Sequence, residues 1–181
     1  MRKKVIDAME SMNIRYDIIE HPAVYTIDEA DKLNIDSNNE VVKNLFVRDD
    51  KKKRYFLLVL QKNKRVNLKQ IRNKLNCRQL SFASEEDLKK YMGLSKGSVS
   101  PFGILNDADC RVEVVFDKSI LLFERIGVHP NDNKATVWIC PKDLEFIIKN
   151  HGNSIRYLHI WILNNERLKL IKIGKQYYIL K

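Results

Sequence analysis

The chain has 181 residues, of which 44% are hydrophobic, and its formal net charge is +10. This length and composition predict one domain with a substantial buried core, and no apolar run approaches the roughly 18 residues that span a bilayer. The first residues, MRKKVIDAMESMNIRYD, interrupt their hydrophobicity too often for a signal peptide, so we expect a soluble, cytoplasmic protein with no membrane partner.

The first part of the chain predicts a helix, a strand, a second helix and a β-hairpin. Val5, Met9 and Met12 recur at helical spacing, and YDIIEH alternates as a strand. Thr26 followed by Glu29 is a capping box that begins a short helix. EVVKNLFVRD and RYFLLVLQ then read as two strands of a hairpin whose tip is the charged DDKKK.

The second part mixes helices and strands without repeats. NLKQIRNKL and SEEDLKKYM are predicted helices, the latter with Ser84 as N-cap, and RQLSF between them is a strand. RVEVVFD, LLFERIGV, KATVWIC and IRYLHIWIL are predicted strands, and KLIKIGKQYYIL forms one or two more. PKDLEFIIKNHG is a helix that begins at Pro141 and ends before Gly152. The fold class is α+β, a single domain with a mixed, mostly antiparallel central sheet surrounded by helices.

Positive charge is concentrated between residues 48 and 72, where ten Lys and Arg residues accompany only Asp49 and Asp50. Residues 161–181 are also basic. A localised excess of this kind is typical of a polyanion partner, RNA or DNA before membrane. The alternative is a lysine-rich hairpin that is simply solvated, and the patch alone does not decide between the two.

Familiar catalytic and metal-binding motifs are missing. Cys77, Cys110 and Cys140 form no C-x-x-C pair, and the four histidines never fall within four residues of one another. The P-loop, dinucleotide, zinc-protease and nucleophile-elbow patterns do not occur. We therefore predict no metal and no cofactor, and any chemistry must rest on other groups.

Three segments place polar residues where packing does not demand them. Lys43 and Asn44 interrupt the apolar run VVKNLFV, either as solvent-facing residues or as groups that meet a phosphate or ribose. GSVSPFG is either a plain turn or a Gly/Pro-constrained loop that points backbone N–H groups at a carbonyl oxygen. In RIGVHPND, His129 is either incidental or part of a pocket wall.

Five blocks, EHPAVYTIDEA, VVKNLFVRD, RQLSFASEEDL, GSVSPFGILND and GVHPN, occur in this order between residues 20 and 131, within a similarity that covers roughly residues 2–160. Together they resemble the YbaK/ProX superfamily of aminoacyl-tRNA editing domains, and within it the free-standing Ala-tRNA(Pro) deacylase branch. The resemblance implies a YbaK/ProX-like domain over residues 1–160, followed by a basic extension over 161–181 that lies outside the pattern.

The resemblance also implies roles for particular residues. The implied catalytic residues are Lys43 beside the tRNA 3′ end, Asn44, and the GxxxP loop Gly97, Ser98, Val99, Ser100 and Pro101. The implied substrate-binding residues are His129, Gly127, Thr26 and His21. The residues expected to contact tRNA phosphates are Lys51, Lys52, Lys53, Arg54, Lys62, Lys64 and Arg65.

The implied activity is hydrolysis of mischarged tRNA in trans, most simply of Ala-tRNA(Pro), with the loop placing the ester and a water. Asn44 after the lysine favours alanine over the Thr-containing Cys-tRNA(Pro) branch. Deacylation of Cys-tRNA(Pro) or another small-amino-acid tRNA, or a non-catalytic module that binds tRNA or a synthetase, remains the alternative. Aminoacylated proline tRNA is the expected partner, and prolyl-tRNA synthetase a second.

Overall fold

The computed structural model describes residues 1–24, 41–160, 170–173 and 176–179. The helix predicted to begin at Thr26 lies outside these residues. The helical elements are α1 (Arg2–Ser11), α3 (Leu68–Leu75), α4 (Glu85–Met92), α5 (Pro141–His151) and the 3-10 helices η1 (Pro101–Asn106) and η2 (Lys118–Leu122). The strands are β1 (Tyr16–Glu20), β2 (Val42–Asp49), β3 (Tyr55–Gln61), β4 (Leu80–Phe82), β5 (Val112–Asp117), β6 (Ile126–Val128), β7 (Ala135–Ile139), β8 (Ile155–Leu158), β9 (Leu170–Ile173) and β10 (Gln176–Ile179).

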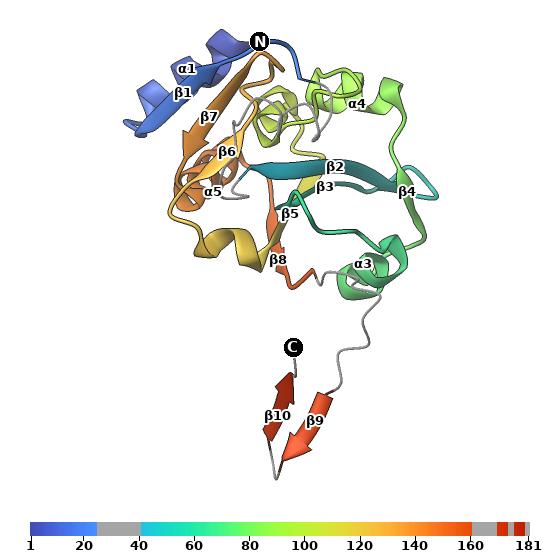
Figure 1. Cartoon of the computed structure of the whole chain (residues 1–181). Helices are drawn as coiled ribbons and strands as arrows, with labels where there is room; N and C mark the ends of the chain where they lie inside the picture. Colours follow the sequence, from blue (N-terminus) through green and yellow to red (C-terminus); the bar gives the residue numbers. More distant parts are fainter. Residues whose placement is uncertain (25–40, 161–169, 174–175, 180–181) are drawn as a thin grey trace.

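A five-stranded sheet in the order β4-β2-β3-β5-β8 forms the centre of the molecule (Figure 1). β2 is antiparallel to β4 and β3, whereas β3, β5 and β8 run parallel. A second sheet, β1-β7-β6, is entirely antiparallel, and β9 pairs antiparallel with β10. The predicted α+β fold with mixed, mostly antiparallel strand pairing is confirmed.

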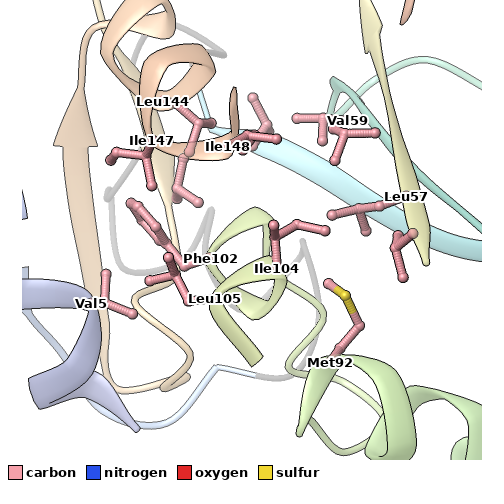
Figure 2. Packing of buried hydrophobic residues seen from close by; sticks show 14 of the residues in the cluster. Val5, Leu57, Val59, Met92, Phe102, Ile104, Leu105, Leu144, Ile147 and Ile148 are labelled. Carbon is pink, nitrogen blue, oxygen red and sulfur yellow. The ribbon is translucent and has the colours of Figure 1, made fainter. Parts of the chain in front are cut away.

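The two faces of β2 contribute to two different cores. Val42 and Phe46 pack in the larger cluster, and Val47 packs with Leu45 in the smaller cluster, which includes residues of α3. This division follows from the strand period of two, which sends alternate side chains to opposite faces. η1 lies inside the larger cluster, where Phe102 meets side chains from α1 and α5 (Figure 2).

The predicted cap of α4 is confirmed and extended by contacts with the sheet. The Ser84 side chain accepts the Asp87 N–H and the Asp87 side chain accepts the Ser84 N–H, which completes a capping box. Asp87 also forms an ion pair with Arg48 at 2.7 Å and accepts the Tyr55 hydroxyl at 3.1 Å. Burial and hydrogen bonding with Tyr91 and Asp87 raise the pKa of Tyr55 to about 12.

The strand predicted for LLFERIGV is wrong over its first half. Its first two residues, Leu121 and Leu122, are instead the end of η2, because the Asp117 side chain accepts the Ser119 N–H and begins a helical turn there. Only Ile126–Val128 extend as β6. α5 begins at Pro141 and ends at His151, just before its C-cap Gly152, as predicted. Within the described ranges, no helix is both long and apolar enough to cross a bilayer.

Candidate functional site

A cleft lies where β4 leaves the edge of β2. The two strands pair from Val47 with Phe82 to Asp49 with Leu80, and the Ala83 N–H then donates to the Phe46 carbonyl at 3.0 Å. Beyond this point the edge of β2 is open to a cleft of about 510 Å³. Its lining includes Asn44, Leu45, Phe82, Glu85, Lys96, Gly97 and Val99.

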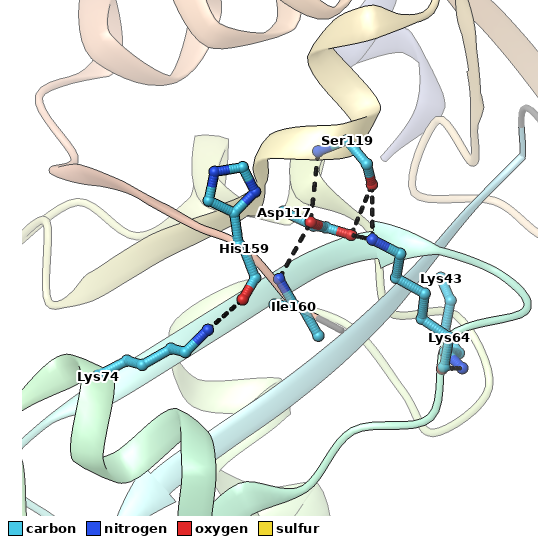
Figure 3. A network of polar contacts seen from close by, with 7 residues as sticks. All are labelled: Lys43, Lys64, Lys74, Asp117, Ser119, His159 and Ile160. Atoms are coloured by element: carbon cyan, nitrogen blue, oxygen red, sulfur yellow. Dashed lines mark hydrogen bonds and ion pairs between the residues drawn. The ribbon is translucent and has the colours of Figure 1, made fainter. Parts of the chain in front are cut away.

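The cleft takes side chains from both faces of β2. Leu45 belongs to the smaller core, and Asn44 lies on the opposite face. Lys43 therefore shares the face of Leu45, and its ammonium donates to the Lys64 carbonyl (Figure 3). The structure places Lys43 and Asn44 at the same strand edge but on opposite faces, and both catalytic roles stay predictions.

The first half of the GxxxP loop lines this cleft. Gly97 has a φ of +86°, a left-handed conformation that an L side chain adopts only with strain. The Ser98 N–H and hydroxyl both donate to the Ser95 carbonyl, at 3.1 and 2.8 Å, and so form a tight turn. Among the described residues, none accepts a hydrogen bond from the backbone N–H of Gly97 or Val99. Two donors are thus available beside the cleft.

The second half of the loop, Ser100 and Pro101, is buried. The Ser100 hydroxyl donates to the His129 carbonyl and accepts the Phe102 N–H at 3.2 Å. The Asn131 amide donates to the Phe102 carbonyl at 3.1 Å. These contacts attach the loop to the segment after β6, so Ser100 positions the loop and does not face a substrate.

The predicted substrate residues gather on the three-stranded sheet. A Cβ on Gly127 would lie 2.8 Å from Val41 Cγ2 and 3.1 Å from Thr136 Cγ2, so only glycine lets β6 approach the start of β2 this closely. His21 Nε2 lies 3.0 Å from Thr136 Oγ1. His129 follows β6 and is tied to the loop through its carbonyl. Thr26 lies outside the described residues.

Burial lowers the pKa of His129 below its ordinary value of 6.5, and the nearby His21 acts in the same direction. The unfolded chain then binds a proton at His129 more readily than the folded protein does. The stability contributed by neutral His129 is therefore complete above pH 6.5 and is lost as the pH falls through the pKa of the folded protein.

We expect the free energy of unfolding in urea to fall more between about pH 7.5 and about pH 5.5 in wild type than in His129→Asn. Equal losses would contradict this.

Lys64 does not lie on the surface expected to bind phosphate. Its ammonium lies 2.5 Å from Asp117 Oδ2 and 2.8 Å from the Ser119 hydroxyl (Figure 3), and its side chain is only 9% exposed. A lysine buried in this way is stable only when it is paired. The expectation for Lys64 is therefore corrected: it is an internal ion pair that fixes the segment after β3, including the carbonyl that holds Lys43.

The other predicted basic residues differ in exposure. Lys51, Lys52 and Lys53 are exposed in the β2–β3 turn, whereas Arg54 lies 3.4 Å from Glu113 and its guanidinium stands 4.8 Å over the Phe56 ring. Lys62 is half-buried. Arg65 is exposed, and after burial its charge is the second cause that lowers the pKa of Lys43. The exposed turn is the strongest phosphate-binding candidate among them.

Most residues that line the cleft were not predicted as site residues, and Phe82, Glu85 and Lys96 are the ones among them with an aromatic or charged side chain exposed to solvent. Phe82 and Glu85 belong to RQLSFASEEDL, which predicts a strand and a helix cap and is one of the five blocks of the resemblance, but neither residue is among the predicted site residues. The available signal was that Phe82 ends a very short strand, where a large apolar side chain has little core to enter. Among the described residues, no three His, Cys, Asp or Glu side chains gather to hold a metal ion.

Comparison with known proteins identifies the family of this chain. The family model described as "Aminoacyl-tRNA editing domain" matches residues 21–147. The chain belongs to the aminoacyl-tRNA editing domain family. The match includes the cleft, the GxxxP loop and His129, so the resemblance seen in the five sequence blocks is confirmed.

Relatives of this editing domain are both free-standing and fused. The chain is 45% identical over 159 residues to the "Prolyl-tRNA editing protein ProX" of Acetoanaerobium sticklandii, which covers 88% of this chain and 97% of the relative. It is 30% identical over 135 residues to a "Proline--tRNA ligase" of Limosilactobacillus reuteri, covering 73% of this chain but 23% of the ligase. A solved structure described as a candidate trans-editing enzyme for prolyl tRNA synthetase shares the fold, with a TM-score of 0.67 at 20% identity over 86% of this chain and 94% of its own.

Proposed function

We propose that the protein hydrolyses mischarged tRNA in trans, and that its substrate is Ala-tRNA(Pro). The 45% identity to a protein named as a prolyl-tRNA editing protein, over nearly the full length of both, supports a free-standing editing enzyme that acts on proline tRNA. A synthetic site for proline excludes the smaller alanine poorly, because a missing methylene costs only about 1–3 kcal/mol of discrimination. An editing cleft that admits alanine and excludes proline by size supplies the second sieve.

The observation that carries this proposal is the chemistry of the loop beside the cleft. The hydroxyls of Ser98 and Ser100 both donate to backbone carbonyls, so neither is poised as a nucleophile. The N–H groups of Gly97 and Val99 remain to orient the ester carbonyl and to stabilise the oxyanion that develops on it. A water attacks that carbonyl, the bond to the ribose oxygen breaks, and the ribose oxygen takes a proton.

Two further residues have roles in this account. Asn44 lies in the cleft with its Oδ1 buried and without a partner among the described residues, so it is available to accept a hydrogen bond from the substrate near the ester. Lys43, on the other face of the strand, holds the 3′-terminal nucleotide through its phosphate or ribose. An aminoacyl ester is already activated, which is why no protein nucleophile is required.

The proposal is tested by incubating the purified protein with Ala-tRNA(Pro) and following free alanine. We expect release well above the rate in buffer. A non-catalytic module that binds tRNA or a synthetase is the second candidate, favoured by the match to a segment of proline–tRNA ligase. If the protein binds tRNA tightly but releases alanine no faster than buffer does, the result would support the binding module and contradict the proposed deacylase activity.

The exposed turn at Lys51–Lys53 is proposed to contact acceptor-stem phosphates. Replacing all three lysines by alanine should weaken tRNA binding and reduce the slope of log affinity against log salt by about 2–3, since each phosphate contact contributes a slope of roughly 0.7–0.9. Binding measured by anisotropy over a salt series checks this. The matched control is Lys3→Ala and Lys142→Ala on α1 and α5, which should leave the slope unchanged; an unchanged slope in the triple variant would place the phosphate contacts elsewhere.

A further inference from the structure

Phe82 is a large aromatic side chain that the core leaves in solvent. It is 60% exposed, whereas Leu80, on the same face of β4, is only 7% exposed and packs in the smaller core. Phe82 pairs with Val47, the residue of β2 at which the strand pairing with β4 ends. It therefore stands at the mouth of the cleft, directly beside the open edge of β2.

The cleft around Phe82 offers three kinds of contact. Phe82 and Leu45 give a flat apolar surface, Lys96 brings an exposed ammonium, and Asn44 Oδ1 is a buried acceptor without a partner among the described residues. A nucleotide matches all three, because it has an aromatic base, a phosphate and hydroxyl or amine donors. A purely apolar ligand would leave both the ammonium and the buried amide oxygen unpaired.

These contacts lie on both faces of β2 at its open edge, an arrangement that fits a terminal nucleotide. Phe82 and Leu45 lie on one face of β2, and Asn44 lies on the other with the N–H donors of the loop. Lys96 and Glu85 both line the cleft, and the exposed lysines of the β2–β3 turn lie at the tip of the hairpin that β2 and β3 form (Figure 1), where they add positive charge along the same strand pair.

We propose that Phe82 stacks on an unpaired base of the tRNA 3′ end, so that the nucleotide crosses the open edge of β2 with its base on Phe82 and its ester beside Gly97 and Val99. This subsite rests on the proposed deacylation of tRNA and adds the group that holds the base. Stacking of a base on an aromatic ring tolerates any sequence, so Phe82 supplies affinity for the single-stranded end and not the choice of tRNA.

The test is the steady-state deacylation of Ala-tRNA(Pro) by variants at Phe82. Because stacking is equally strong before and during ester hydrolysis, Phe82→Ala should raise KM about tenfold and change kcat by less than about twofold. Phe82→Tyr should restore the wild-type KM, whereas Phe82→Leu, which keeps apolar bulk without a π-face, should resemble the alanine variant. Thermal melting of each variant shows that the fold is kept.

Two controls isolate the stacking contact. Phe146 on α5 is 52% exposed, and the chain runs from α5 into β8, at the sheet edge opposite β4 (Figure 1). Phe146→Ala removes an equally exposed ring far from the cleft and should leave KM unchanged. A substrate with an abasic nucleotide at the stacked position should lose affinity with wild type, and Phe82→Ala should then add nothing further.

The stacking proposal and the proposed deacylase activity are contradicted by different results. Alanine release by wild type with an unchanged KM in Phe82→Ala, or a KM in Phe82→Leu equal to that of wild type, overturns the stacking and leaves the deacylase intact. If wild type releases no alanine, an uncharged acceptor-stem RNA ending in CCA is used instead, with binding followed by fluorescence anisotropy. About tenfold weaker binding by Phe82→Ala then supports the subsite, and equal binding overturns it.

Discussion

Lys43→Ala is expected to lower kcat/KM for Ala-tRNA(Pro) by about 100-fold while the protein stays folded. A contact between an ammonium and a phosphate or ribose oxygen contributes roughly 1.5–3 kcal/mol, which is about 10- to 150-fold in rate. In the folded protein the ammonium donates only to the Lys64 carbonyl among the contacts described, and its burial lowers the pKa of Lys43, with Arg65 as a second cause. Removing the side chain loses one hydrogen bond but also relieves the burial of a charge, so stability changes little.

A matched control for Lys43 lies in the same polar network. Lys74 on α3 also donates its ammonium to a backbone carbonyl, that of His159 (Figure 3), and it is not among the residues that line the cleft. Lys74→Ala should keep wild-type kinetics, and Lys43→Arg should recover part of the activity because it keeps the charge. Near-wild-type rates in Lys43→Ala, with Lys74→Ala equally unaffected, would move the nucleotide site away from this face of β2.

Gly97→Ala is expected to lower kcat by about 100-fold, because removing or misplacing one oxyanion donor costs on the order of 10²–10³ in rate. At a φ of +86°, an alanine side chain adds strain of about 1–2 kcal/mol, which the loop relieves by turning its N–H groups away from the ester. Since the donors act in the transition state, kcat should fall more than KM rises.

The effect of strain alone is measured with a second glycine. Gly152 caps α5 at a φ of +110° and lies away from the cleft, and a Cβ there would come 3.0 Å from Cys110 Sγ. Because it adds this close contact to the strain, Gly152→Ala should lower the melting temperature at least as much as Gly97→Ala but keep kcat. If both variants lose stability and neither loses turnover, the GxxxP loop is structural and the oxyanion donors lie elsewhere.

Much of the fold follows from local patterns in the sequence. The two runs rich in Val, Leu and Phe on either side of DDKKK predicted β2 and β3. Ser84, Pro141 and Gly152 predicted the ends of two helices, because caps depend on neighbouring residues only. The last two residues of η2, Leu121 and Leu122, fall in a predicted strand because LLFERIGV is apolar enough for either structure. The Asp117 side chain, four residues before the run begins, decides for the helical turn.

The site was less accessible to sequence reasoning, for reasons that differ between residues. The burial of Lys64 depends on Asp117, 53 residues later, and no local pattern shows that pairing. The exposure of Phe82 depends on where β4 stops pairing with β2, which is also a long-range feature. The separation of Lys43 from Asn44 was predictable, because neighbouring residues in a strand point to opposite faces.

The GxxxP loop has some features that follow from local sequence and others that depend on long-range packing. Its glycine and proline predicted a constrained backbone, and the positive φ of Gly97 agrees with that interpretation. The burial of Ser100 and its bond to the His129 carbonyl come from the packing of η1 against the segment after β6, which brings together residues 29 apart in the chain. Only the structure shows that Gly97 and Val99, and not all five loop residues, line the cleft.

The most direct test of the proposed function is a competition in which the protein acts on Ala-tRNA(Pro), Cys-tRNA(Pro) and Pro-tRNA(Pro) under single-turnover conditions. The three substrates share one tRNA and differ only in the amino acid, so their relative rates report on the cleft alone. We predict rapid release of alanine, slower release of cysteine and no release of proline above the buffer rate. Release of proline as fast as alanine would contradict a size-selective editing cleft, and preferential release of cysteine would assign the cleft to the other substrate.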